Sequence, residues 1–285
     1  MGPSANTETP MKAEEVRKAT DAALERLAES LNAGQSDALT TYLAAMAKFH
    51  RYSFGNVLLI VSQKPDATHV AGFHTWRKFD RFVKKGEKGI AIFAPMMLKR
   101  RDAQTDEERE QKVLRFRVVY VFDISQTDGE PLPEHARVTG DPKHHLKRLK
   151  DFVAQKGIML NYALMIGGGA EGVSRGGEIT ILSDLPPAEE FAVLVHELAH
   201  EMLHHGDDRK DFSKTVRETE AEAVAFVVTQ AVGLSNSTAS SDYISLYAGD
   251  AKVLADSLDR IQRTAASIIE AVVQHDAVEL VDDAA

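Results

Sequence analysis

The pentad His196-Glu197-Leu198-Ala199-His200 brings together three side chains that could bind and use a metal ion. Residues four apart on an α-helix lie on one face, so the two imidazoles could hold one Zn²⁺ ion with Glu197 beside it. A carboxylate at that place can take the proton of a water molecule that attacks a carbonyl carbon. The spacing therefore predicts a zinc centre that hydrolyses amide bonds, with His196 and His200 as ligands.

The residues around the pentad favour the helix that this geometry needs. Pro187 suits a first helical turn, Glu189 and Glu190 place carboxylates at its positive end, apolar residues recur as far as Leu203, and Gly206 could end it. A short motif can also arise by chance on a helix that has no chemical role. The apolar context makes the metal site the stronger interpretation.

A third protein ligand is expected, because catalytic zinc usually has three and keeps a fourth position for water. His204 lies eight residues after His196, about 12 Å along a continuous helix, which is too far to share the ion. The extended His-Glu-x-x-His-x-x-Gly-x-x-His pattern is absent, because Gly206 stands where its last histidine would be. The third ligand is therefore not expected to be a histidine.

An acidic run at residues 218–222 opens an apolar helix that ends near Gly233. Glu218 and Glu222 share a helix face, so we expect Glu218 to bind the zinc and Glu222 to accept a hydrogen bond from a ligating imidazole. Glu220 points to roughly the opposite side and is the alternative ligand. Three solvated surface glutamates would explain the same run, because charge clusters commonly lie on the surface.

A short strand is expected at residues 178–183, directly before the helix of the pentad. Its edge could hold an extended peptide over the metal by main-chain hydrogen bonds, which would make the substrate a polypeptide. An ordinary core strand explains the pattern equally well.

Composition limits the class of protein. The chain has 285 residues, of which 44% are hydrophobic and 27% charged, as in globular proteins of one large or two ordinary domains. No apolar run reaches the length of a membrane span, and the N-terminal residues lack the apolar core of a signal peptide. With no cysteine, the chain has neither disulfides nor thiol chemistry. We expect a cytoplasmic protein without a membrane partner.

Charge divides the chain into two unlike halves. Residues 1–130 hold 20 basic and 18 acidic residues, whereas residues 131–285 hold 14 and 25. Residues 48–101 contain 12 basic and three acidic residues, a net charge of +9. Proline and glycine cluster at residues 128–133, the best linker candidate. The sequence thus predicts an N-terminal domain at 1–130 and a C-terminal domain at 131–285.

The hydrophobic pattern predicts an α+β protein, with N-terminal helices and a small β-sheet followed by a second α+β domain. The expected helices lie at about 11–31, 36–50, 56–62, 142–156 and 241–275, in addition to the two helices of the metal site. The expected strands lie at 68–73, 90–93 and 114–122 and within 159–183.

Aromatic residues interleave with cations in the basic segment, as in surfaces that bind single-stranded nucleic acid by stacking bases and tracking phosphates. Core phenylalanines and solvated lysines would give a similar pattern. The candidate DNA-binding residues are Arg51, Tyr52, Trp76, Arg77, Lys78, Lys84, Lys85 and Lys88.

Several motifs resemble a known family. The segments at 54–60, 63–68, 70–76 and 83–90 look like the N-terminal domain of ArdC-type antirestriction proteins. The pentad together with residues 218–228 is similar to the metallopeptidase domain of that family, which is related to zincins of the ImmA/IrrE type. The resemblance covers most of residues 40–250, in the same order along the chain.

This resemblance implies an N-terminal domain that binds single-stranded DNA and a C-terminal zincin-like metallopeptidase domain. It also implies a plasmid or other mobile element whose incoming DNA is protected from host restriction. By position it agrees with zinc on His196, His200 and Glu218 and with Glu197 as the catalytic base. Tyr243 matches a family tyrosine that could stabilise an oxyanion, although a packing role explains it as well.

Three functions are compatible with the sequence. In the first, the protein binds single-stranded DNA and cleaves a polypeptide. In the second, it protects DNA by masking the DNA or a restriction enzyme, and its zinc site is not catalytic. In the third, it is a regulatory protease of the ImmA/IrrE kind that cleaves a repressor.

Overall fold

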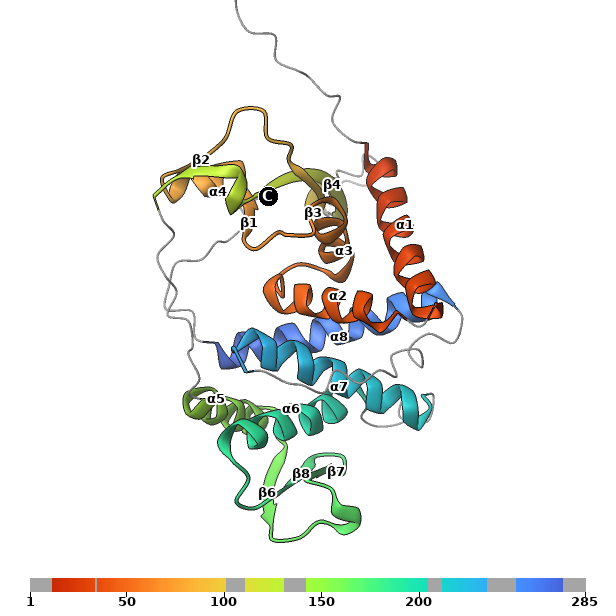
Figure 1. Cartoon of the computed structure of the whole chain (residues 1–285), viewed down its shortest axis with the longest axis vertical. Helices are drawn as coiled ribbons and strands as arrows, with labels where there is room; N and C mark the ends of the chain where they lie inside the picture. The colour runs from red at the N-terminus through yellow and green to blue at the C-terminus, as the bar shows by residue number, and fades with distance from the viewer. Residues whose placement is uncertain are drawn as a thin grey trace, which may run out of the picture. The chain divides into compact units, whose positions relative to one another are not determined.

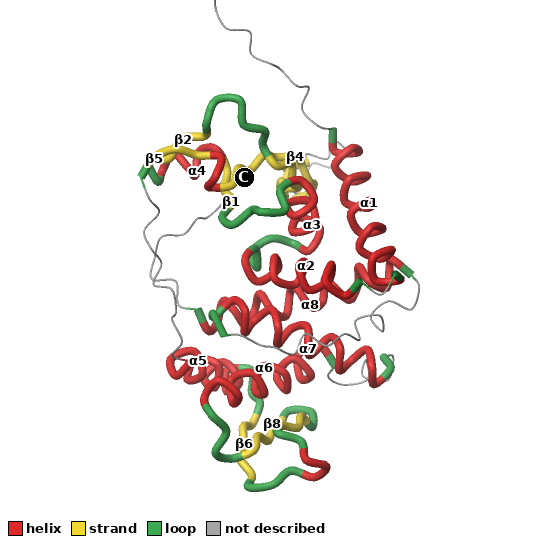
Figure 2. Tube along the Cα trace, in the orientation of Figure 1, coloured by secondary structure: helices red, strands yellow, loops and turns green. Residues whose placement is uncertain are grey.

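The computed structural model describes residues 12–33, 35–100, 111–130, 142–204, 212–234 and 250–273. The chain divides into two compact units. Unit 1 lies within residues 1–23 and 58–133, together with 278–285, and unit 2 lies within residues 24–57 and 134–277. Both contain helices and strands (Figures 1 and 2), so the predicted α+β class is confirmed. No described helix is long and apolar enough to cross a membrane.

Unit 1 is built on a three-stranded antiparallel sheet in the order β1-β4-β3. Strands β3 and β4 form a long hairpin, whose register runs from the pair Ile90 and Val121 to the pair Arg100 and Gln111. A separate ribbon pairs β2 with β5. The elements are β1 (Val70–Gly72), α4 (Phe73–Lys78), β2 (Arg81–Val83), β3 (Ile90–Arg100), β4 (Gln111–Asp123) and β5 (Thr127–Gly129).

Two buried side chains tie α4 and the start of β1 to β4. Trp76 is fully buried, and its Nε1 donates a hydrogen bond to the carbonyl of Phe122 at 2.8 Å. Asp123 is also buried, and one of its carboxylate oxygens accepts hydrogen bonds from the main-chain N–H groups of Thr68 at 2.7 Å and His69 at 3.0 Å. These contacts fix unit 1 through residues that are distant in sequence.

The predicted linker at 128–133 is wrong in its first part. Asp128 and Gly129 belong to β5 and pair with Phe82 and Arg81 of β2. The buried guanidinium of Arg81 donates to the hydroxyl and carbonyl of Thr127 and to the carbonyl of Gly129. The Pro-Gly composition suggested a flexible connection because it did not reveal these ribbon hydrogen bonds. The domain limits at 1–130 and 131–285 stay a prediction, and residues 24–57 cluster with unit 2.

Unit 2 combines helices with a small mixed sheet in the order β6-β8-β7, in which β6 is parallel and β7 antiparallel to β8. Helix α6 lies between this sheet and α7 (Figure 1). The limits of the units fall within α1 (Ala13–Asn32) and α3 (Phe54–Gln63). The other elements are α2 (Ser36–Lys48), α5 (Pro142–Gln155), β6 (Met159–Ala163), β7 (Gly172–Ser174), β8 (Glu178–Leu182), α6 (Pro187–Leu203), α7 (Lys214–Ala231) and α8 (Ala251–Val272).

Local sequence explains the two helices that carry the site. Helix α6 starts at Pro187 with two glutamates in its first turn, and its residues Phe191, Leu194, Val195 and Leu198 form one fully buried stripe at helical spacing. Helix α7 starts after Ser213, whose hydroxyl accepts a hydrogen bond from the N–H of Val216. This cap places the start of α7 four residues before the predicted one, so the acidic run lies within the helix.

The expected helices at 36–50 and 142–156 and the strands at 90–93 and 114–122 correspond to α2, α5, β3 and β4. The expected C-terminal helix is observed as α8, and residues 241–249 lie outside the described residues. The strand at 178–183 is observed as β8, but β6 and β7 occupy both of its edges. The prediction that this strand offers a free edge to a peptide is therefore wrong.

Candidate metal centre

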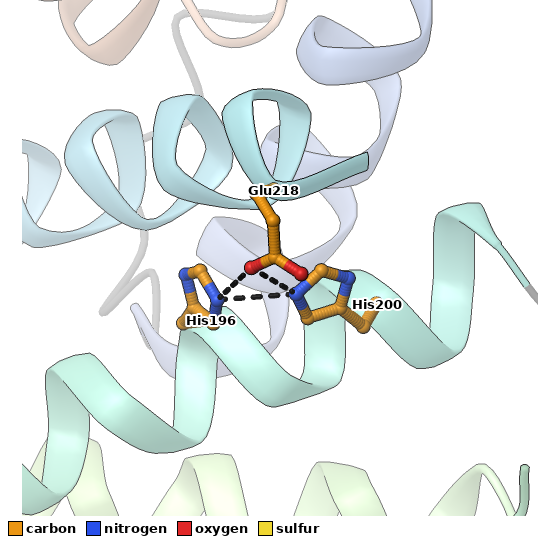
Figure 3. A group of neighbouring side chains, drawn as sticks. All are labelled: His196, His200 and Glu218. Atoms are coloured by element: carbon orange, nitrogen blue, oxygen red, sulfur yellow. Dashed lines mark hydrogen bonds and ion pairs between the residues drawn. The ribbon is translucent and has the colours of Figure 1, made fainter. Parts of the chain in front are cut away.

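His196, His200 and Glu218 meet between α6 and α7, as Figure 3 shows. The two imidazole Nε2 atoms are 3.1 Å apart, and Glu218 Oε2 lies 3.6 Å from the Nε2 of His196 and 3.4 Å from that of His200. The histidines are one turn apart on α6, and the carboxylate comes from the second turn of α7. Among the described residues, this is the group of side chains that could hold a metal ion.

The spacing of these three atoms fits one small cation. A tetrahedral zinc ion with bonds of about 2.0–2.1 Å holds its ligand atoms about 3.3 Å from one another. The separations of 3.1, 3.4 and 3.6 Å lie around that value. Three donors that converge on a common point in this way could hold one metal ion.

The two neighbouring histidines favour the ionised form of the Glu218 carboxylate, which is the form that binds a metal. The imidazole of His196 beside Glu218 lowers the pKa of that carboxyl to about 2, with His200 acting in the same direction. The side chain of Glu218 is 46% exposed, whereas those of His196 and His200 are 25% and 15% exposed. The three candidate ligands are therefore two largely buried imidazoles and one ionised, partly exposed carboxylate.

Glu197 lies beside this centre on the side of the sheet. It is buried, and burial raises its pKa, while His196 lowers it and Glu218 raises it further. The hydroxyl and the main-chain N–H of Ser174 on β7 act in the opposite direction and lower the pKa. Burial moves the pKa of this carboxylate in the direction that favours a general base.

A pocket of about 700 Å³ opens over the three side chains and Glu197. Its walls come from β7, from α6 and from the first turn of α7. The ligand atoms are therefore accessible to water.

Glu201 is a structural residue of the site that sequence reasoning missed. It is buried one residue after His200, and its two carboxylate oxygens accept hydrogen bonds from the N–H groups of Gly176 at 2.8 Å and Gly177 at 2.6 Å. Both glycines have positive φ, 71° and 87°, in the turn between β7 and β8. Helix α6 thus fixes the hairpin that contacts Glu197. The Gly-Gly pair was a visible signal of the turn, but nothing in the sequence joined it to Glu201.

Glu220, the alternative ligand, serves another purpose. It is fully buried on the α8 side of α7, where Ser257 and Arg260 donate to its Oε1. Its Oε2 lies 3.4 Å from the Nε2 of His204, a buried residue whose pKa burial lowers to about 4. Glu220 therefore joins α7 to α8 and to the end of α6. The role of Glu222, which is half-buried on α7, stays a prediction, and Tyr243 lies outside the described residues.

Comparison with known proteins places this geometry in context. Residues 12–122 match the sequence model of the N-terminal domain of anti-restriction factor ArdC. The fold matches the metal-free crystal structure of the antirestriction protein ArdC from plasmid R388 with a TM-score of 0.55 and 20% identity, covering 89% of this chain and 97% of that one. The Mn(II)-bound structure of the same protein matches with a TM-score of 0.52 and 17% identity, covering 90% and 98%. Residues 12–122 are therefore similar in sequence to the ArdC N-terminal domain, and the chain shares the fold of the R388 protein.

A further relative is an uncharacterized protein of Bacillus anthracis, 29% identical over 272 residues. The match covers 80% of this chain and 46% of the relative. The chain thus spans about half the length of that relative.

The predicted DNA-binding residues differ in their exposure to solvent. Trp76 is a predicted base-stacking residue, but its ring is fully buried. Its Nε1 donates a hydrogen bond to the carbonyl of Phe122. This expectation is wrong, because the aromatic pattern did not distinguish a core ring from a surface ring. Lys84 is half-buried, with its Nζ bonded to the carbonyl of Ser125 and 3.5 Å from Asp128. The side chains of Arg77, Lys78, Lys85 and Lys88 are exposed.

The remaining two candidates lie in unit 2, where Arg51 is exposed and Tyr52 is half-buried. Gln262 of α8 donates a hydrogen bond to the carbonyl of Tyr52 at 3.1 Å. The exposed large aromatic residues of unit 1 are instead Phe73, Phe82 and Phe116, at 45%, 54% and 55% exposure. Sequence reasoning ranked Trp76 above these phenylalanines because it could not assign their faces.

Proposed function

We propose that this protein is an antirestriction protein of a mobile element that combines a zinc-dependent peptidase centre with binding of single-stranded DNA. The observation that carries the peptidase half is the convergence of His196, His200 and Glu218 beside the buried Glu197. The match of residues 12–122 to the ArdC N-terminal domain supports the antirestriction role.

The donor set favours zinc within the class of divalent metals. Two imidazoles and one carboxylate that leave a position for water are typical of catalytic zinc, whereas Mn²⁺ prefers sites made of oxygen atoms. The related R388 protein has been crystallised with Mn(II), so metal analysis of the purified protein must distinguish the two ions. One equivalent of zinc per chain is the expected content.

The chemistry follows from the positions of the side chains. Zinc, when bound, would polarise the scissile carbonyl and lower the pKa of water. Glu197 would accept the proton of the attacking water and pass it to the leaving amine. Ser174 lies beside the Glu197 carboxylate and would help to position it. The burial that raises the pKa of Glu197 makes its carboxylate a better proton acceptor.

A polypeptide is the substrate class that suits β7. This strand has β8 on one side and, among the described strands, no partner on the other. The N–H of Leu182 bonds to the carbonyl of Glu171, and that of Arg175 to the carbonyl of Glu178, so the main-chain groups of Gly172 and Ser174 point away from β8. The N–H of Ser174 is directed to Glu197, which leaves the main-chain groups of Gly172 and the carbonyl of Ser174 for a peptide. An extended peptide could therefore add to this edge beside the metal ligands.

Unit 1 supplies groups suited to a single strand of DNA. Exposed cations at the end of α4 and in the turn after β2 can contact phosphates, and the exposed ring of Phe82 on β2 can stack on a base. The predicted affinity is higher for single strands than for duplex and falls steeply with salt, because phosphate contacts release counterions.

The decisive variant for the peptidase is Glu197→Gln. It is expected to keep its metal and to lose peptide hydrolysis and protection of incoming DNA, when compared with wild type by metal analysis, by cleavage of a peptide library and by transfer of unmethylated plasmid DNA into a restricting host. The matched control is Glu189→Gln, an exposed glutamate in the first turn of the same helix.

The outcomes separate the alternative functions. Protection that persists in Glu197→Gln would assign the activity to DNA masking and make the metal centre non-catalytic. Cleavage of a single DNA-bound regulator in cells, found by comparing the proteomes of wild type and variant, would indicate a regulatory protease. Hydrolysis that persists in the variant would remove Glu197 from the mechanism.

A further inference from the structure

Three cationic residues stand on the rim of the metal pocket. Arg175 directly follows β7, and Lys214 and Arg217 occupy the first turn of α7. These three cations belong to a part of the sequence with a net negative charge, since residues 131–285 contain 14 basic and 25 acidic residues. The sign of the charge at the rim is therefore opposite to that of the surrounding sequence.

Among the described residues, the acidic side chains of the pocket form no ion pair with these cations. Glu218 is paired with His196 and His200, and Glu201 is occupied by the N–H groups of the β7–β8 turn. Glu197 is buried, and Ser174 lies beside its carboxylate. The three carboxylates thus have other partners, and the bound cation would add further positive charge.

The positions of Lys214 and Arg217 bring their charges close to the metal. Lys214 lies one helical turn before Glu218 on the same face of α7, about 6 Å along the axis. Arg217 directly precedes Glu218, and the Nε of its half-buried guanidinium has no hydrogen-bond partner within the described part of the chain. A partly desolvated guanidinium is stabilised by a carboxylate that meets its planar fork.

We propose that Arg175, Lys214 and Arg217 form a subsite for a carboxylate of the polypeptide substrate, so that the centre selects acidic side chains close to the scissile bond. This inference rests on the proposed peptidase function, whose substrate class it narrows. A peptide on the edge of β7 would run between Arg175 and the first turn of α7, where alternate side chains face the pocket wall.

A carboxylate can come from an Asp or Glu side chain or from the C-terminus of a peptide. The test therefore uses two pools of peptides from a digested bacterial proteome, one with free and one with amidated C-termini. Each pool is equilibrated with zinc-loaded Glu197→Gln protein, and the bound peptides are identified by mass spectrometry. The same pools are then exposed to wild-type enzyme to map the cleaved bonds.

We expect bound peptides from both pools to be enriched about tenfold in Asp and Glu at one position, which is typical of a charged hydrogen bond in a partly buried site. Replacing the three cations by glutamine in the Glu197→Gln background should remove the enrichment. Lys147→Gln, which neutralises an exposed cation of α5 away from the pocket, should leave it unchanged.

The other outcomes distinguish failure of the subsite from failure of the proposed peptidase function. Enrichment restricted to the pool with free C-termini would assign the subsite to a terminal carboxylate. Displacement of the bound peptides by an oligonucleotide, with oligonucleotide binding that is lost in the triple variant, would assign it to phosphate. Cleavage by wild type without acidic preference would refute the subsite and leave the peptidase intact, whereas acidic enrichment without cleavage would refute the peptidase and leave the subsite.

Discussion

Gly172 of β7 lies directly against Glu197 of α6. A Cβ atom built on Gly172 would stand 2.8 Å from the Cγ and 2.9 Å from the Oε1 of Glu197. Both distances are shorter than a normal van der Waals contact, so only glycine lets the strand approach the helix this closely. The position of the proposed catalytic base therefore depends on the absence of a side chain on the neighbouring strand.

Gly172→Ala should displace Glu197 or push β7 away from α6, because Val193 also lies 2.7 Å from the added methyl. Overpacking of this kind costs about 1–3 kcal/mol in the free energy of unfolding. Peptide hydrolysis should fall while the metal content stays unchanged. Gly167→Ala is the matched control, since its added Cβ would meet no atom within 4 Å. Equal activity of the two variants would argue against the close approach.

Removal of the metal should lower the thermal stability of the wild-type protein. A ligand present at about 1,000 times its dissociation constant stabilises the folded state by about 4 kcal/mol. We expect a chelator to lower the Tm of wild type, whereas Glu218→Gln should show a low metal content and little response to the chelator. A Tm of wild type that does not depend on metal would contradict a tightly bound ion at this site.

Glu201→Ala should loosen the β7–β8 turn without removing a metal ligand. Two main-chain N–H groups, of Gly176 and Gly177, would lose their acceptor, at a cost of about 1–3 kcal/mol in stability. The KM for peptides should rise, because β7 would no longer be held beside Glu197. Glu201→Gln keeps one acceptor oxygen and should give an intermediate effect. A normal KM in both variants would show that the turn does not need this carboxylate.

The stability of unit 1 should depend on pH through Asp123. Burial alone would raise the pKa of this carboxyl, but hydrogen bonds from Thr68, Ser125 and His69 outweigh it and lower the pKa. A lowered pKa in the folded state gives stability that is fully present above the unfolded value of about 3.9 and is lost as the pH falls through the folded value.

Asp123→Ala should therefore cost about 1–3 kcal/mol at pH 7 and less as the pH approaches 3. Urea unfolding of wild type and variant at several pH values measures this difference. If Asp123→Ala lowers the free energy of unfolding equally at pH 7 and pH 3, the loss comes from packing alone.

Substitutions at two aromatic residues of unit 1 should affect DNA binding differently. Phe82→Ala is expected to weaken binding of single-stranded DNA by about 1–3 kcal/mol, the contribution of one stacked base. Trp76→Phe should leave DNA affinity unchanged and lower stability by about 1 kcal/mol, because the carbonyl of Phe122 loses its donor. Fluorescence anisotropy with a labelled oligonucleotide and urea unfolding measure the two effects. Loss of DNA affinity in Trp76→Phe alone would reverse this assignment.

The sequence by itself determined the local part of the metal centre. The spacing of His196 and His200 fixes their common face, because backbone hydrogen bonding gives every α-helix the same period. The α+β class and most helices also followed from local apolar periodicity. These features depend on residues near one another in the chain, so their signal is contained in short segments.

Only the tertiary structure decided which partners those segments meet. Glu218 and Glu220 lie on different faces of α7, and the packing of α7 between α6 and α8 directs the first to the imidazoles and the second to Arg260. The burial of Trp76 and the hydrogen bond from the β7–β8 turn to Glu201 likewise could not be predicted from the sequence. Each of these features depends on contacts between elements that are distant in the chain. Composition and periodicity describe only neighbouring residues, so they do not indicate which distant element a side chain will contact.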